Sequence, residues 1–130
     1  MPLEIVATDA APRAIGPYSQ AVVAPAGRWV FCSGQIAIDP KTGDFASAGD
    51  IRQETHQVMK NLDAILRAAG TSFASVVKCT IFLVDLGNFA AVNEVYATYF
   101  PETKPARATV QVVALPRGAQ VEIDAIAVAF

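Results

Sequence analysis

The sequence predicts an α+β fold in which a single mixed β-sheet carries two helices on one face. Three strands, a helix, a strand, a helix and two strands follow one another without repeat or linker. Each helix has one apolar face, which a common sheet can bury. The 130 residues are 53% hydrophobic and only 17% charged, whereas an ordinary soluble domain is about 25% charged. The other sheet face should therefore be apolar and covered by further copies of the chain.

Three strands are expected before the first helix, and the segment between the first two is irregular. Residues 8–20 hold two prolines and a glycine that exclude a helix. A turn is expected at residues 40–43, whose sequence Pro-Lys-Thr-Gly begins with a proline and ends with a glycine. The strands themselves are predicted at residues 3–7, 20–24 and 28–33.

The strongest helix is predicted between Asp50 and Gly70. Asp50 is a suitable N-cap with Gln53 three residues later, and Gly70 supplies the C-terminal stop. Apolar residues recur between them at spacings of three and four, which gives the helix one apolar face.

A strand, a second helix and two closing strands complete the chain. The strand is predicted at residues 75–84, and Asp85 or Asn88 can cap a helix that runs to Phe100. The closing strands flank residues 116–119 and are expected to form an antiparallel hairpin.

Composition argues against several partners. The net charge is −2 and the Lys and Arg residues are scattered, so no basic stripe for nucleic acid is visible. No signal peptide or apolar run of about 18 residues is present, which predicts a cytoplasmic protein without a membrane partner. Cys32 and Cys79 lie in apolar runs and are expected to be buried free thiols.

Counting residues also argues against several kinds of site. With one histidine, a catalytic triad would depend on His56 alone, and its helix position favours a solvated surface side chain. One His and two strand cysteines do not supply a zinc site, and no glycine-rich phosphate loop is present. No metal is expected.

Arg107 is the one charge between Pro105 and Leu115, inside a predicted strand. A guanidinium keeps its proton, so it needs an anionic partner or water. One interpretation is a structural salt bridge, within the chain or across a subunit interface. The other is a bidentate clamp on the carboxylate of a substrate.

Other polar residues stand where apolar ones are normal. Glu122 and Asp124 share one face of their strand. They belong either to an exposed edge or to a site where one accepts a proton from water. Asn93 lies on the inner face of the second helix, Tyr18 in a turn, and Gly34 where a ligand can approach the backbone.

A resemblance to a known family is carried by residues 11–20, 33–36, 53–70, 85–86, 89–90, 92–93, 105–107 and 121–123. Taken together, these segments resemble the RidA (YjgF-type) family of reactive-intermediate imine and enamine deaminases over essentially the whole chain. The resemblance implies one domain, residues 1–130, with a chorismate-mutase-like fold assembled as a homotrimeric barrel with pockets at subunit interfaces. It also implies hydrolysis of 2-aminoacrylate, 2-iminopropanoate and 2-iminobutanoate to 2-keto acids and ammonia, without a cofactor.

By position, Arg107 matches the family's carboxylate-binding arginine and Glu122 the glutamate that orients the attacking water. Thr109 stands where some members have a cysteine, and Val113 where a smaller residue is usual, which could alter packing or pocket width. The residues that match the substrate-binding pocket are Tyr18, Ser33, Gly34, Phe89, Asn93, Arg107 and Thr109.

Two other functions compete with the deaminase. One is a non-catalytic trimer that binds small carboxylates or another protein, in which Glu122 is dispensable. The other is a ribonuclease, which the acidic composition and the single His56 disfavour. Whether Arg107 and Glu122 can face one substrate depends on the register of the closing strands.

Overall fold

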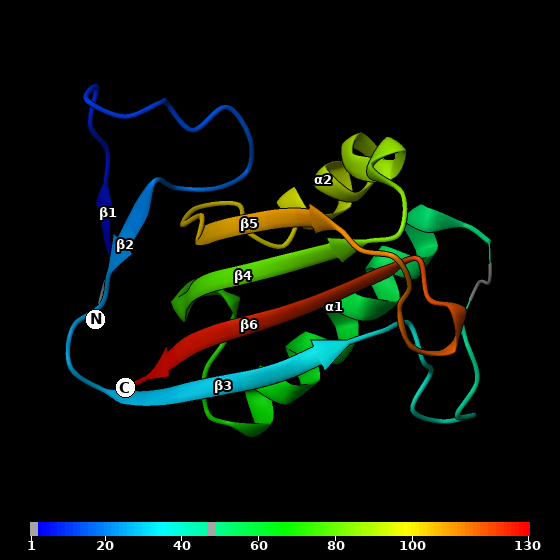
Figure 1. Cartoon of the computed structure of the whole chain (residues 1–130). Helices are drawn as coiled ribbons and strands as arrows, with labels where there is room; N and C mark the ends of the chain where they lie inside the picture. Colours follow the sequence, from blue (N-terminus) through cyan, green and yellow to red (C-terminus); the bar gives the residue numbers. More distant parts are fainter. Residues whose placement is uncertain (1–2, 47–48) are drawn as a thin grey trace.

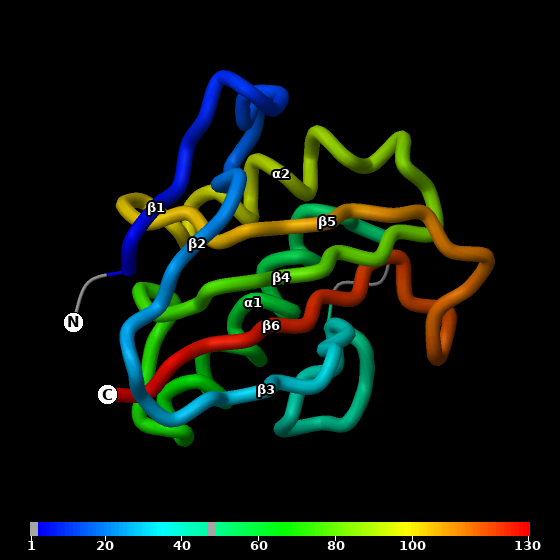
Figure 2. The backbone as a smooth tube through the Cα atoms, turned by 60° about the vertical axis from the view of Figure 1, so that its left-hand side comes forward, coloured from blue at the N-terminus to red at the C-terminus, as the bar shows by residue number. Residues whose placement is uncertain are grey.

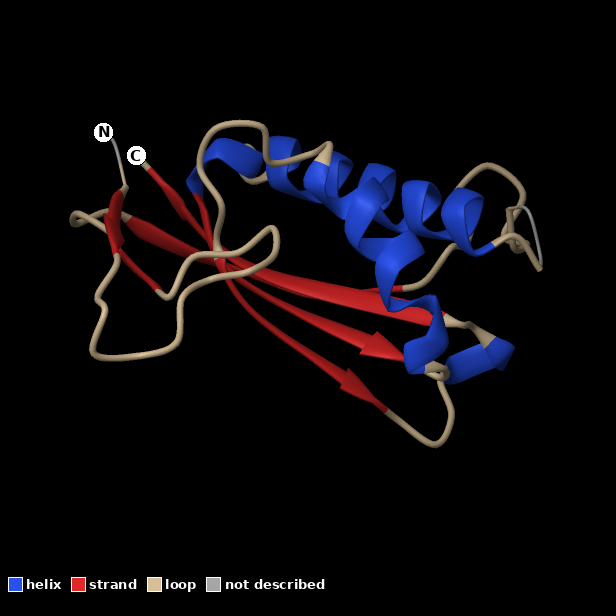
Figure 3. Cartoon of the chain, turned by 90° about the horizontal axis from the view of Figure 1, so that it is seen from above, coloured by secondary structure: helices blue, strands red, loops and turns tan. Residues whose placement is uncertain are grey.

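The computed structural model describes residues 3–46 and 49–130. Its main body is a four-stranded sheet in the order β3-β6-β4-β5 with both helices on one face (Figures 1 and 3). The sheet strands are β3 (Arg28–Gln35), β4 (Val76–Leu83), β5 (Ala106–Gln111) and β6 (Val121–Ala129). The helices are α1 (Ile51–Ala68) and α2 (Phe89–Ala97), with short 3₁₀ turns η1 (Phe73–Ser75), η2 (Leu86–Asn88) and η3 (Pro116–Gly118).

The predicted α+β architecture is confirmed. The sheet is mixed, because β4 and β5 are parallel whereas β6 runs antiparallel to both β3 and β4. The first two strands, β1 (Glu4–Val6) and β2 (Ala21–Val23), pair with each other and form a separate two-stranded sheet. Figure 2 shows this small sheet, in blue, next to the ends of the main strands.

Local signals specify both ends of α1. The Asp50 side chain accepts hydrogen bonds from the backbone N–H groups of Arg52 and Gln53 at 3.0 and 3.1 Å. Gly70 adopts φ +81° just beyond the helix, where a residue without a side chain is favoured. The second helix starts later than Asp85 would place it, because Asp85 caps the 3₁₀ turn η2 instead, and α2 ends at Ala97 rather than Phe100.

The two closing strands do not form the predicted hairpin. β5 lies at the sheet edge, parallel to β4, and β6 inserts between β3 and β4. The prediction was wrong because burial, not proximity in sequence, decides the pairing. β6 presents Val121, Ile123 and Ala125 to the core, all at most 1% exposed, whereas β5 presents the polar Arg107 and Thr109 on that face and can only occupy an edge.

The core lies between the sheet and the helices. Its largest fully buried side chains include Met59 and Leu62 of α1, Ile81 of β4 and Tyr96 of α2. Cys32 and Cys79 are buried free cysteines, as predicted. Burial raises the pKa of the Cys79 thiol to about 12, so it stays protonated and unreactive at neutral pH.

The opposite face of the sheet is uncovered in the single chain, as the composition predicted. Trp29 and Phe31 on β3 are 56% and 74% exposed, and Val110 on β5 is 43% exposed. These residues alternate with core-facing neighbours such as Cys32, so their side chains stand on the side away from the helices. We call this side the bare face. Among the described residues, no helix is long and apolar enough to cross a membrane.

Glu54, a buried carboxylate on α1, anchors the beginning of β6. It is 2% exposed, and its Oε2 accepts hydrogen bonds from the backbone N–H groups of Gln120 and Val121 at 2.8 and 3.2 Å. Its Oε1 accepts from the side-chain amide of Gln120 at 3.2 Å. A charged residue thus joins α1 to the strand that carries Glu122.

We expect Glu54→Ala to lower the free energy of unfolding by about 3 kcal/mol, because buried N–H donors lose their acceptor. Glu54→Gln should cost less than about 1 kcal/mol, since its amide oxygen can accept both backbone bonds while the Gln120 amide turns over. Urea denaturation of the two variants checks this. Equal losses for both would show that the hydrogen bonds are not what Glu54 contributes.

Candidate functional site

Arg107 lies at the start of the edge strand β5, on the face covered by α2. Its Nη1 donates a hydrogen bond to Asn93 Oδ1 at 2.6 Å. Its Cζ lies 5.4, 5.6 and 5.3 Å from the ring centroids of Tyr18, Phe89 and Tyr96. One amide and three aromatic faces therefore hold the guanidinium, an arrangement that favours a cation.

No carboxylate neutralises Arg107 within the described part of the chain. The ion pairs there join Asp9 to Arg13, Arg52 to Glu94, and Asp63 to Arg67. Burial lowers the pKa of Arg107 below its ordinary value, yet a guanidinium does not lose its proton near neutral pH. The interpretation of Arg107 as one half of a salt bridge within the chain is therefore wrong. It is a half-buried cation without an anionic partner among the described residues.

The irregular segment 8–20 brings Tyr18 to Arg107. The backbone N–H of Ser19 donates to the carbonyl of Pro105 at 3.1 Å, and Ser19 Oγ donates to the carbonyl of Lys104 at 2.5 Å. These bonds tie the segment to the residues just before Arg107. Gly16 lies so close that a Cβ there would be 3.6 Å from Arg107 Nη2.

Glu122 lies on the bare face, on the other side of the sheet from Arg107. Its neighbours Val121 and Ile123 face the core, so Glu122 and Asp124 point the opposite way. A Cβ added to Gly34 would lie 2.8 Å from Glu122 Cδ, so the carboxylate rests against that glycine. Ser33, next to Gly34, is exposed.

Asp124 and Glu122 have different surroundings although they share this face. Asp124 Oδ1 accepts a hydrogen bond from the backbone N–H of Thr80 at 2.9 Å. Within the described part of the chain, no hydrogen bond or ion pair engages Glu122. The exposed-edge interpretation of these two residues is wrong because β6 is paired on both sides. Glu122 is thus the carboxylate free to act on a ligand or water.

Three further residues that the sequence analysis singled out are Thr109, Val113 and His56, and only Thr109 lies beside Arg107. Thr109 follows Arg107 on the same face of β5, and its hydroxyl is buried without a hydrogen-bond partner in the described region. Val113 is 99% exposed, so in a single chain it alters no packing. His56 is half-buried and its Nδ1 lies 2.9 Å from the Tyr99 hydroxyl, which corrects the prediction of a solvated side chain.

The site is open in a single chain. A cavity of about 430 Å³ lies beside Tyr18 and one of about 460 Å³ beside Gly34, but neither is lined by Arg107 or Glu122. In the described residues, no three His, Cys, Asp or Glu side chains come together as metal ligands. The arrangement offers two half-sites, an anion-binding one at Arg107 and an acidic one at Glu122.

Sequence reasoning missed three residues that shape these half-sites. Tyr96 lies under Arg107, and its spacing of three from Asn93 on the inner helix face could have shown this. Glu54 and Gln20 hold the backbone around the half-sites through bonds to residues that no local pattern connects with them.

The chain is similar to known proteins over nearly its whole length. Residues 8–129 match the family described as Endoribonuclease L-PSP. The chain is 58% identical to Protein DfrA of Myxococcus xanthus, over 98% of this chain and 97% of that one. It is 50% identical to the mouse (Mus musculus) 2-iminobutanoate/2-iminopropanoate deaminase, over 96% of this chain and 90% of that protein.

A solved structure extends the likeness to three dimensions. The crystal structure of Escherichia coli TdcF with bound serine superposes with a TM-score of 0.75 at 42% identity, and the match covers 98% of this chain and 99% of that one. The sequence matches span nearly the whole chain, and the fold agrees. The chain therefore belongs to the Endoribonuclease L-PSP family, which is also known as the YjgF/RidA family.

Proposed function

We propose that the protein is a hydrolytic deaminase that converts small 2-imino acids and their enamines to 2-keto acids and ammonia. Its substrates would include 2-iminopropanoate, 2-iminobutanoate and 2-aminoacrylate. The observation that carries the proposal is Arg107, a half-buried guanidinium held by Asn93 that meets no carboxylate in the described chain. The activity named for the mouse relative and the serine bound by TdcF support a small carboxylate as the ligand.

The reaction needs positioning rather than a strong nucleophile. Arg107 binds the substrate carboxylate through the nitrogens that Asn93 leaves free. A water molecule then adds to the C=N carbon while Glu122 accepts one of its protons. The nitrogen takes up protons, the C–N bond breaks, ammonia leaves and the C=O bond forms. Imines of 2-keto acids already hydrolyse in water, and each tenfold acceleration requires only about 1.4 kcal/mol.

One substrate can touch Arg107 and Glu122 only if two copies of the chain supply them. The two side chains lie on opposite faces of the sheet in a single chain. In a homotrimer, the bare face of one copy would lie against the Arg107 edge of the next, and a head-to-tail ring closes three equivalent sites. The same contact would cover the exposed Trp29 and Phe31.

The proposal is tested by the release of 2-keto acid from imines made in the assay. A pyridoxal-phosphate dehydratase acting on serine or threonine supplies the imines, and the protein should raise the rate of keto-acid formation above the buffer rate. An excess of the protein that changes no rate, with imines from several amino acids, would refute the deaminase.

We expect Gly34→Ala to lower kcat about 100-fold, because the added Cβ pushes the Glu122 carboxylate from its place and a misplacement of about 1 Å can cost that much. The atoms that must move belong to a side chain with one free end, so the melting temperature should change by less than about 4 °C. Steady-state kinetics and calorimetric melting check both parts. Unchanged kcat would show that the position of Glu122 is not critical.

Two alternative functions predict results that differ from those expected of a deaminase. A non-catalytic carboxylate-binding trimer would bind pyruvate in a calorimeter without accelerating imine hydrolysis, and Glu122→Gln would leave that binding unchanged. An RNA-cleaving protein, which the family description names, would cut RNA at physiological salt. The net charge of −2 and a single His56 already engaged with Tyr99 favour the small carboxylate.

A further inference from the structure

The segment 8–20 positions part of the Arg107 half-site without regular secondary structure. It leaves β1 after Val6 and returns to β2 at Ala21. Its far end is fixed by Ser19, which bonds to the residues before Arg107. Something else must fix its near end, because an unrestrained segment of this length has many conformations.

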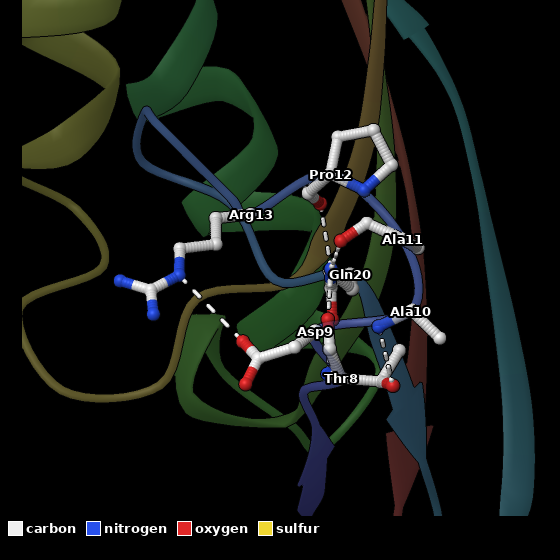
Figure 4. A network of polar contacts seen from close by, with 7 residues as sticks. All are labelled: Thr8, Asp9, Ala10, Ala11, Pro12, Arg13 and Gln20. Carbon is white, nitrogen blue, oxygen red and sulfur yellow. Dashed lines mark hydrogen bonds and ion pairs between the residues drawn. The ribbon is translucent and has the colours of Figure 1, made fainter.

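Gln20 supplies the bonds at that near end (Figure 4). Its Oε1 accepts a hydrogen bond from the backbone N–H of Thr8 at 2.6 Å. Its Nε2 donates to the carbonyl of Pro12 at 2.6 Å, and lies 3.1 and 3.3 Å from the carbonyls of Thr8 and Ala11. One side chain therefore joins four backbone groups that span residues 8–12.

We infer that Gln20 is a positioning residue for the Arg107 half-site. Residues 13–17 run between Pro12, which Gln20 holds, and Tyr18 and Ser19, which are held at Arg107 and Pro105. With both ends fixed, Gly16 and the Tyr18 ring stay against the guanidinium. This inference rests on the proposed function, in which Arg107 binds the substrate carboxylate. Gln20 would support that binding by positioning the segment, and it takes no part in the chemical step.

The chemistry requires a glutamine. Its amide offers an acceptor to Thr8 N–H and donors to carbonyls. Gln20→Glu has nearly the same shape and keeps the acceptor, but sets a carboxylate against three carbonyl oxygens. Gln20→Leu removes donor and acceptor together. Gln53→Glu and Gln53→Leu on the exposed side of α1 are matched controls, since Gln53 is exposed and stands in neither half-site.

The sequence provides a cleavage site that reports on this segment. Trypsin cuts after Arg13, whose side chain is 83% exposed, and a protease needs the chain to open locally. We expect Gln20→Glu and Gln20→Leu to be cut between Arg13 and Ala14 at least tenfold faster than wild type at pH 8. The Gln53 variants should be cut at the wild-type rate.

Binding and kinetics test the link to Arg107. The Kd for pyruvate, measured by calorimetry, should rise about tenfold in both Gln20 variants, and KM should rise more than kcat falls. For Gln20→Glu, the affinity should recover as the pH is lowered from 7 to 5, because protonation restores a donor toward the carbonyls. Gln20→Leu should show no such recovery, and this contrast separates positioning from a general loss of structure.

Wild-type rates of cleavage after Arg13, or an unchanged Kd for pyruvate, would overturn the inference. Neither measurement requires turnover. If the wild type binds pyruvate but accelerates no imine hydrolysis, the deaminase proposal fails while the role of Gln20 is still supported by a raised Kd in its variants.

Discussion

Replacing Arg107 by alanine is expected to lower kcat/KM for imine hydrolysis about 100-fold or more. The variant removes the one cation that Asn93, Tyr18, Phe89 and Tyr96 hold at the half-site. A charge-assisted pair in a partly buried place contributes about 3 kcal/mol, and each 1.4 kcal/mol is about tenfold in rate. Arg107→Lys keeps a charge but loses the planar fork, so we expect about a tenfold loss.

Pyruvate binding by calorimetry, together with steady-state kinetics, checks this expectation. Arg67→Ala is the matched control, because Arg67 is an exposed arginine on α1 paired with Asp63. Arg107→Ala should not lower the stability of the fold, since the arginine is desolvated without a carboxylate to compensate that cost. A Kd for pyruvate within about twofold of wild type would mean that another group binds the carboxylate.

The elements of the fold that local chemistry specifies could be predicted from sequence. Asp50 and Gly70 mark the ends of α1 through a side-chain acceptor and a positive φ, and both effects act within a few residues. Strand pairing is different. β5 and β6 adjoin in sequence, yet the polar Arg107 and Thr109 confine β5 to an edge, while the apolar side of β6 belongs in the centre.

The candidate site was predictable in its residues but not in its arrangement. Arg107 and Glu122 could be recognised because each is a charge within a strand. That they lie on opposite faces follows from pairing with β4, which local sequence does not reveal. Glu54 could not have been found at all, because its partners Gln120 and Val121 are 66 and 67 residues away.

Mixing two inactive variants, Arg107→Ala and Glu122→Gln, is expected to restore activity. Each should be inactive alone, since removal of a general base costs about 100-fold or more. If one chain supplies Arg107 and the next supplies Glu122, a trimer containing both variants has interfaces where an intact Arg107 meets an intact Glu122. In an equal, random mixture, about one quarter of the sites are intact. The two chains are co-expressed in equal amounts with different tags that verify the ratio, and the unfractionated trimers are assayed for keto-acid release.

The control is a double variant that carries both changes, mixed equally with wild type. It distinguishes a site shared between two chains from a site formed within one chain. A site shared between chains is intact only where two wild-type chains adjoin, so about one quarter of the sites should work. A site formed within one chain would leave about half of them active, and would recover nothing from the two single variants. Because Arg107 and Glu122 lie on opposite faces of the sheet, we expect one quarter in both mixtures. Zero recovery from the single variants, with half of the sites active in the control mixture, would show that Arg107 and Glu122 of one chain form the same site.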